Sequence, residues 1–242
     1  MDRDATGRGM TSDIHPMDKG RTDSMQETVF RVTAIERQKR NPARVSVYLD
    51  GAYGFGLDEE VLFRNPIHEG DSLSESFIDE VLLFDERVRA KAKALRLLSH
   101  RALAADELRQ KLLDRDFSER TTERILADLV RVGLLNDESY ATAFVHARMS
   151  QRPSSKRLLE IELKRKGIGE KEAERIVEGA YGPESESQVA EMLFRKKMES
   201  LKGEDPRKAR KKAVEFLFRR GFDWELIRSA MDGAGGEDSI SD

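Results

Sequence analysis

The sequence contains no cysteine, so it has neither a disulfide framework nor a cysteine-ligated metal site, and a reducing compartment suits it. No apolar run approaches the roughly 20 residues that span a bilayer. The first residues also lack the hydrophobic centre of a secretory signal peptide. We therefore expect a cytoplasmic protein without membrane contact, whose 242 residues form one or two domains.

The motifs of common enzyme classes are also missing. There is no Gly-Lys-Ser/Thr sequence for a nucleoside triphosphate and no Gly-x-Ser-x-Gly elbow for a serine nucleophile. Gly51, Gly54 and Gly56 stand in reverse order relative to the dinucleotide fingerprint, and they lie between expected strands. The four histidines share no metal-ligand spacing. We expect no catalytic residue, no metal and no cofactor, and hence a protein that is not an enzyme.

What the sequence does contain is a repeated block, at residues 112–117, 163–168 and 217–222. Each copy has three positions in the same order. First comes a residue type that tolerates the left-handed conformation, then an apolar residue, and then a residue type that favours a helix N-cap. These apolar residues, Phe117, Ile168 and Phe222, are predicted to be buried between two helices. A further amphipathic segment precedes each pair of helices. The repeat is therefore a three-helix unit of about fifty residues.

A different pattern precedes the repeats. Residues 28–35, 45–49 and 52–57 alternate as strands, and Asp50-Gly51 is typical of a tight hairpin turn, which together predict a small β-meander. A short helix is expected from Asp58 and another from Ser74 to Phe84, leading into the repeats.

The predicted fold is mainly α-helical, with an elongated array of tandem three-helix repeats after a small β-containing domain. The predicted segments are a disordered tail at 1–26, the β-containing domain at 27–86, the three repeats at 87–137, 138–183 and 184–233, and a second disordered tail at 234–242. Met25 stands immediately before the structured part and is a candidate for the true start.

Positive charge is concentrated in the part of the chain that holds the repeats. Residues 87–233 hold 33 Lys and Arg against 25 Asp and Glu, although the whole chain has a net charge of −3. A basic cluster on a helix is often only a solvated face. Here the clusters recur beside the same helix ending in every repeat, so a stack of repeats would align them into a stripe suited to a polyanion.

Several segments resemble the RecX family. The matching residues begin with Ala94-Leu95, Leu98-Ser99 and Arg101, then Glu107-Leu108 and Lys111-Leu112; they continue with Gly133 to Glu138, Tyr140-Ala141, Phe144 and Arg148, and then Lys156 to Leu158, Glu160, Leu163 and Lys166 to Ile168. The resemblance covers about residues 28–232. It departs from the family at residues 151–155, where members commonly carry a glycine before the basic pair.

This resemblance implies a modulator, mostly negative, of the RecA recombinase. RecX-like proteins lie in the groove of the RecA filament on single-stranded DNA, limit its extension and depress its ATPase and strand exchange in recombination and the SOS response. It implies a monomer that reaches single-stranded DNA weakly or through RecA. On this hypothesis the contacts to phosphate or acidic RecA surface are Arg101, Lys111, Arg115, Lys156, Arg157, Lys164, Arg165, Lys166, Arg207, Lys208, Lys211, Lys212, Arg219 and Arg220.

Other functions compete with this one. Residues 163–177 resemble a helix-hairpin-helix, which would make the protein a direct, sequence-independent DNA binder. Helix-cap chemistry already accounts for Gly167 and Gly169 in that segment. A helix-turn-helix transcription factor would read DNA with residues 170–178, but four Glu in that segment repel phosphates. The protein could also be an enzyme with an unrecognised site, but the sequence offers no candidate catalytic residues for one.

Overall fold

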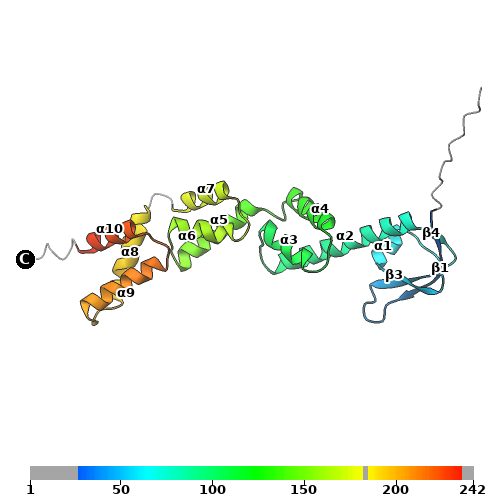
Figure 1. The fold of residues 1–242 in the computed structure, drawn as a ribbon, viewed down its shortest axis with the longest axis horizontal. Coiled ribbons are helices and arrows are strands. Elements are labelled where there is room, and N and C mark those ends of the chain that lie inside the picture. Colours follow the sequence, from blue (N-terminus) through cyan, green and yellow to red (C-terminus); the bar gives the residue numbers. More distant parts are fainter. Residues whose placement is uncertain (1–26, 182–184, 236–242) are drawn as a thin grey trace, which may run out of the picture.

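The computed structural model describes residues 27–181 and 185–235. The β-containing domain and the three helical repeats follow one another in chain order along the long axis of an elongated molecule (Figure 1). This is the predicted mainly α-helical array. The predicted N-terminal tail lies outside the described residues. At the other end the last helix continues to Gly235, two residues into the segment assigned to the second tail.

The β-containing domain is a four-stranded antiparallel sheet with a short helix, α1 (Glu59–Arg64). The strands are β1 (Val29–Arg37), β2 (Arg44–Leu49), β3 (Ala52–Asp58) and β4 (Ser72–Ser74), in the order β3-β2-β1-β4. The meander and the Asp50-Gly51 hairpin are confirmed: both turn residues have positive φ, 50° and 83°, as a tight β-hairpin requires. The three-residue strand β4 was not predicted.

A single long helix, α2 (Glu75–His100), joins this domain to the repeats. The sequence prediction of a separate helix ending at Phe84 was wrong, since no Pro or Gly interrupts the segment. The first half of α2 packs Ile78 and Val81 on the sheet, and its second half packs Ala90 and Ala94 in the first repeat. Buried Asp85 ties the helix to the sheet by accepting the Asp58 N–H at 2.7 Å. The boundary placed after residue 86 therefore falls inside one continuous helix.

The other helices complete three units of similar design. They are α3 (Ala105–Leu113) and α4 (Glu119–Arg131), then α5 (Asp137–Gln151), α6 (Lys156–Lys164) and α7 (Glu170–Tyr181), and then α8 (Glu186–Glu199), α9 (Pro206–Phe218) and α10 (Trp224–Gly235). With the second half of α2, they form repeat 1, repeat 2 and repeat 3. None of the helices described is both long and apolar enough to cross a bilayer.

The recurrent block closes the second helix of each repeat and opens the third, and we call it the elbow. Asp116, Gly167 and Gly221 occupy its left-handed position, with φ of 61°, 86° and 83°, as predicted. The apolar residues that follow Gly167 and Gly221 are buried, at 3% and 2% exposure. Phe117 is only partly buried, because repeat 1 has no helical repeat before it.

Two joints connect the repeats with the same contacts. At the first joint, Asp137 at the start of repeat 2 accepts the Ala105 N–H at 2.8 Å. At the second joint, Glu186 at the start of repeat 3 accepts the Lys156 N–H at 2.9 Å. In both cases an acidic first residue of one repeat caps the second helix of the repeat before it.

The elbow glycines are required at these joints. A Cβ atom on Gly167 would lie 2.3 Å from the Cβ of Asp106, and one on Gly221 would lie 2.5 Å from the Oγ of Ser155. Both distances are too short for an ordinary contact. The sequence explains glycine here as a helix cap, and the structure adds that the preceding repeat leaves no room for a side chain.

Candidate nucleic-acid and protein interface

Basic side chains gather around one carboxylate at the first joint. Glu107 accepts a hydrogen bond from Arg101, whose Nη1 lies 3.2 Å from Oε2, and the Nζ of Lys111 lies 3.7 Å from Oε1. The Arg101 hydrogen bond, with further attraction from Lys166 and Lys111, holds the pKa of Glu107 below its usual value. Three predicted contact residues from two repeats therefore meet here, and two positive charges remain in excess.

Basic side chains also gather at the second joint, in a different arrangement. The Nε of Arg148 donates to the Oε2 of Glu162 at 2.9 Å. Burial, with repulsion from Arg152 and Arg148, lowers the pKa of Arg220. Three arginines, Arg148, Arg152 and Arg220, therefore lie close together at the second joint, and one of them holds Glu162. Arg148 and Arg152 were not among the predicted contacts, although Arg152 stands seven residues before Leu159 as Arg101 stands seven before Leu108.

Arg220 has a structural role. Its Nη1 donates to the Pro153 carbonyl oxygen at 2.6 Å, and its guanidinium lies 4.6 Å from the centre of the Phe216 ring. Its own carbonyl oxygen accepts the Ser155 N–H at 2.9 Å. The segment that departs from the family pattern, residues 151–155, therefore forms the second joint, and Arg220 holds it in place.

Three other predicted contacts are neutralised by carboxylates of their own surroundings. The Nζ of Lys164 lies 2.5 Å from Glu170, and the Nζ of Lys212 lies 2.6 Å from Glu204. Lys156 pairs with Glu178 at 2.5 Å and also lies over the Tyr181 ring. These side chains can reach an external anion only by giving up an ion pair.

The remaining predicted contacts form no ion pair with any residue that the structure describes. They are Arg115, Arg157, Arg165, Arg207, Lys208, Lys211 and Arg219. All are exposed. Arg115 lies near Lys93, whose pKa is lowered by desolvation and by repulsion from Arg115.

Three of the unpaired cations share the outer face of α9. This helix buries Ala209, Ala213 and Leu217, so Arg207, Lys208 and Lys211 point away from the core. No acidic residue occupies its first turn. Like charges four residues apart, such as Arg207 and Lys211, destabilise a helix by about 0.2–0.5 kcal/mol per pair. The outer face of α9 therefore carries three exposed basic side chains that form no ion pair in the described chain.

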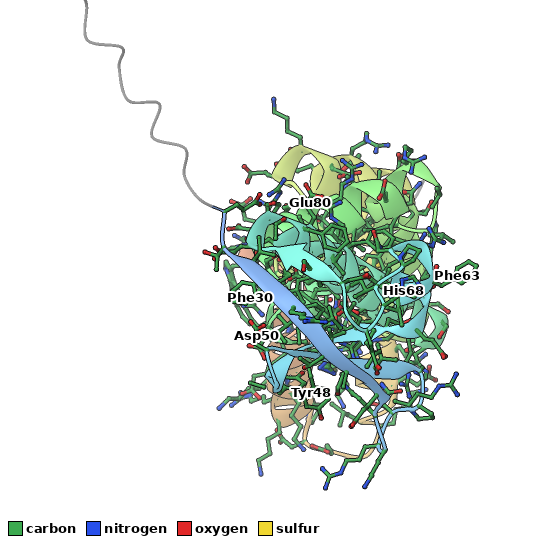
Figure 2. The ribbon with its side chains drawn as sticks, turned by 90° about the vertical axis from the view of Figure 1, so that its right-hand side faces the viewer. Phe30, Tyr48, Asp50, Phe63, His68 and Glu80 are labelled. Atoms are coloured by element: carbon green, nitrogen blue, oxygen red, sulfur yellow. The ribbon has the colours of Figure 1, made fainter. Side chains whose placement is uncertain are left out.

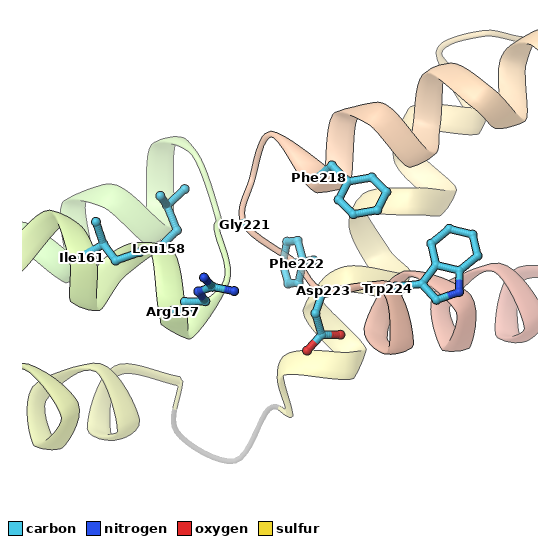
Figure 3. Close-up of a pocket in the computed structure, with 8 residues that line it drawn as sticks. All are labelled: Arg157, Leu158, Ile161, Phe218, Gly221, Phe222, Asp223 and Trp224. Atoms are coloured by element: carbon cyan, nitrogen blue, oxygen red, sulfur yellow. The ribbon is translucent and has the colours of Figure 1, made fainter.

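A cleft lies beside this helix, between α6 of repeat 2 and the elbow of repeat 3 (Figure 3). Arg157, Leu158 and Ile161 form its α6 wall, and Phe218, Phe222 and Trp224 belong to the opposite wall. Phe218 and Trp224 stack with ring centres 6.2 Å apart and planes 12° apart. Sequence reasoning missed this pair, because its two members stand on different helices.

The helix-hairpin-helix segment is not free to bind phosphate. Gly167 packs directly on Asp106 of repeat 1, so a carboxylate already stands against the loop that would have to hold the anion.

In the β-containing domain, Phe63 projects from α1 with 85% of its surface exposed (Figure 2). Among the residues described, no cluster of three or more His, Asp or Glu is arranged to hold a metal ion.

Comparisons with known proteins cover each part of this fold. Sequence models of the regulatory protein RecX N-terminal domain and of the first, second and third RecX three-helix domains match residues 30–74, 90–129, 136–175 and 184–231. The chain is 32% identical over 205 residues to the regulatory protein RecX of Clostridium perfringens strain 13, covering 83% of this chain and 94% of that protein. It is 27% identical over 213 residues to that of Listeria monocytogenes EGD-e, covering 88% of this chain and 79% of the other.

Solved structures agree. A crystal structure of regulatory protein RecX has a TM-score of 0.60 and 26% identity, and the match covers 84% of this chain and 99% of that one. RecX from Lactobacillus salivarius, at 22% identity, shares the fold with a TM-score of 0.52 over 62% of this chain and 97% of its own. With its four domains matched in order, this chain belongs to the RecX family of regulatory proteins.

Proposed function

We propose that this protein is a negative modulator of the RecA recombinase in the cytoplasm. It binds along the groove of the RecA filament on single-stranded DNA as a monomer, and it inhibits ATP hydrolysis, filament extension and strand exchange in recombination and the SOS response. It regulates by binding, without catalysis of its own.

One observation carries the proposal: the positive charges lie at intervals along an elongated array. Three cations surround one carboxylate at the first joint, three arginines lie close together at the second, and the outer face of α9 adds three cations that form no ion pair in the described chain. A compact basic patch would suit a small anion. Charges spaced along three repeats suit a long one, such as DNA or the surface of a filament.

The unpaired cations matter most for affinity. A cation that already holds a carboxylate gains little by exchanging it for a phosphate, whereas a free one releases bound counterions from the nucleic acid. We therefore assign most of the binding to Arg207, Lys208 and Lys211, with a smaller share to the joint clusters. The paired Lys156 and Lys164 contribute least.

The alternative of a DNA-binding helix-hairpin-helix receives less support. Its loop would have to open toward phosphate, and the packing of Gly167 against Asp106 opposes that. The two functions differ in their target: a RecX-like regulator acts on RecA, whereas a helix-hairpin-helix protein binds bare DNA.

The DNA-dependent ATPase of RecA tests the proposal directly. The protein is titrated at substoichiometric amounts into RecA assembled on single-stranded DNA, and we expect hydrolysis to fall. Unchanged hydrolysis together with tight binding to bare DNA would support the helix-hairpin-helix function instead.

A further inference from the structure

An exposed aromatic pair in repeat 3 has no structural reason to be aromatic. Phe218 and Trp224 leave 49% and 54% of their surfaces in solvent although they stack on each other. Each forfeits much of the free energy that burial of a large ring would give.

The equivalent positions in repeat 2 show that the elbow does not need rings. Counted from the buried apolar residue of the elbow, Lys164 and Glu170 stand where Phe218 and Trp224 stand, and they form an ion pair at 2.5 Å. Both pairs bridge the end of one helix and the start of the next. Since an ion pair suffices for this in repeat 2, closing the elbow does not itself require the stacked rings of repeat 3.

The surroundings of the pair are positively charged. Arg207 and Lys211 precede Phe218 by eleven and seven residues, so all three lie along one side of α9, over a distance of about 16 Å. Across the cleft, Arg157 of α6 has no ion pair within the described chain (Figure 3). Asp223 is the one carboxylate in the cleft lining, and its Oδ1 is already engaged by the Leu226 N–H at 2.8 Å.

We propose that this surface binds single-stranded nucleic acid directly, with a nucleobase stacked on the Phe218–Trp224 pair. The phosphates that precede this base follow Lys211 and Arg207 along α9, and Arg157 contacts the backbone on the other side. Flat, parallel rings beside a row of cations match a base attached to a phosphate chain. An apolar protein side chain would use the rings but not the charges.

This contact deepens the proposed function by adding DNA to the partners of repeat 3, yet its test needs no RecA. Trp224 is the only tryptophan of the chain, so emission excited selectively at tryptophan reports on this site alone. The full chain is titrated with oligo(dT) of about 15 nucleotides and with an abasic oligonucleotide of the same length. Oligo(dT) should quench the emission and the abasic strand should not. Equal responses, or none, would overturn the proposal.

A double substitution separates stacking from folding. Phe218→Lys with Trp224→Glu copies the ion pair of repeat 2 into repeat 3 and leaves the net charge unchanged. We expect the affinity for fluorescein-labelled oligo(dT), measured by anisotropy at low salt, to fall at least about fivefold, because stacking contributes about 1–3 kcal/mol per base. Trp224→Phe should keep the affinity within about threefold, since it retains an aromatic face.

Phe63→Ala is the control, because it removes an even more exposed ring from α1, outside the cleft. It should leave the affinity unchanged.

The proposal is wrong if the double variant, with an unaltered circular dichroism spectrum, still binds oligo(dT) as the unmodified protein does. If that variant binds bare DNA normally but no longer binds RecA-coated DNA, the rings hold a protein side chain and the nucleic-acid assignment falls. An intact RecA inhibition by a variant that has lost oligo(dT) binding would leave the regulatory function standing on its own.

Discussion

Repeats 2 and 3 have the same elbow geometry, but different side chains flank the elbow in each. Their elbows share a left-handed glycine and a buried apolar residue, and each packs on the preceding repeat. In repeat 2 the residues that flank the elbow, Lys164 and Glu170, form an ion pair, and Lys156 is also paired with a glutamate. In repeat 3 the flanking residues are stacked rings, and the adjacent helix carries unpaired cations. The architecture is therefore common to both repeats, whereas most of the binding surface that we propose belongs to the third.

The largest effect tests the shared part of this comparison. Gly221→Ala should destabilise the protein by about 2–4 kcal/mol, because the new methyl group needs a left-handed backbone and meets Ser155 and Leu158. Gly133→Ala is the control: its φ is +74°, but nothing lies within 4 Å, so we expect a loss of about 1 kcal/mol. Urea unfolding measures both. Equal losses would mean that the joint imposes no packing constraint.

The second effect tests the difference in charge. Replacing Arg207, Lys208 and Lys211 with alanine should lower the slope of log affinity against log salt by about 2 for single-stranded DNA, since each phosphate contact contributes about 0.7. The measurement is a salt series of anisotropy titrations, with and without RecA. A slope that does not change would show that these side chains contact no phosphate.

A smaller effect concerns the carboxylates at the two joints. The pKa of Glu107 is lowered by its hydrogen bond from Arg101, so its stabilisation is present above its ordinary value of 4.5 and is lost as the pH falls below that value. Burial raises the pKa of Glu186, so its contribution is greatest below 4.5 and is lost as the pH rises through the folded-state pKa.

Thermal unfolding between pH 3 and pH 7 distinguishes the two. Glu107→Gln should lower Tm at pH 7 and have little effect at pH 3. Glu186→Gln should leave Tm at pH 7 unchanged or raise it, since its amide oxygen can still accept the Lys156 N–H. The same response from both variants would contradict the opposite electrostatic roles of the two joints.

The smallest effect is expected in repeat 1. Asp116 holds the left-handed position with φ of 61°, but it is exposed and no helical repeat precedes it. Asp116→Gly relieves backbone strain and adds freedom to the unfolded chain, so stability should change by less than about 0.5 kcal/mol. A loss above about 1 kcal/mol in urea unfolding would show that the aspartate has a contact of its own there.

Local patterns predicted the repeats well. Helix stripes, the elbow and the Asp50-Gly51 turn depend on neighbouring residues, and the structure confirms them. The continuity of α2 was missed because a change of packing partner at Asp85 leaves no mark on helical periodicity. Strand β4 was missed because three residues are too few to show alternation.

The candidate site was predicted less completely, for a related reason. Basic residues are visible in the sequence, but their ion pairs with Glu107, Glu162 or Glu170 depend on contacts between helices and between repeats. The structure consequently divides the fourteen predicted contacts into paired and unpaired cations and gives Arg220 a place in the second joint. The Phe218–Trp224 stack joins two helices, so the contact is seen only in the structure.

The central claim is that repeat 3, more than repeat 2, carries the surface through which this protein regulates. It is tested most directly by RecA ATPase inhibition with two matched variants, each lacking two positive charges: Arg207→Ala with Lys208→Ala, and Lys156→Ala with Lys164→Ala. The concentration for half inhibition should rise about tenfold for the first variant and less than about twofold for the second, because only the first removes unpaired cations. Equal increases, or a larger one for repeat 2, would contradict the account.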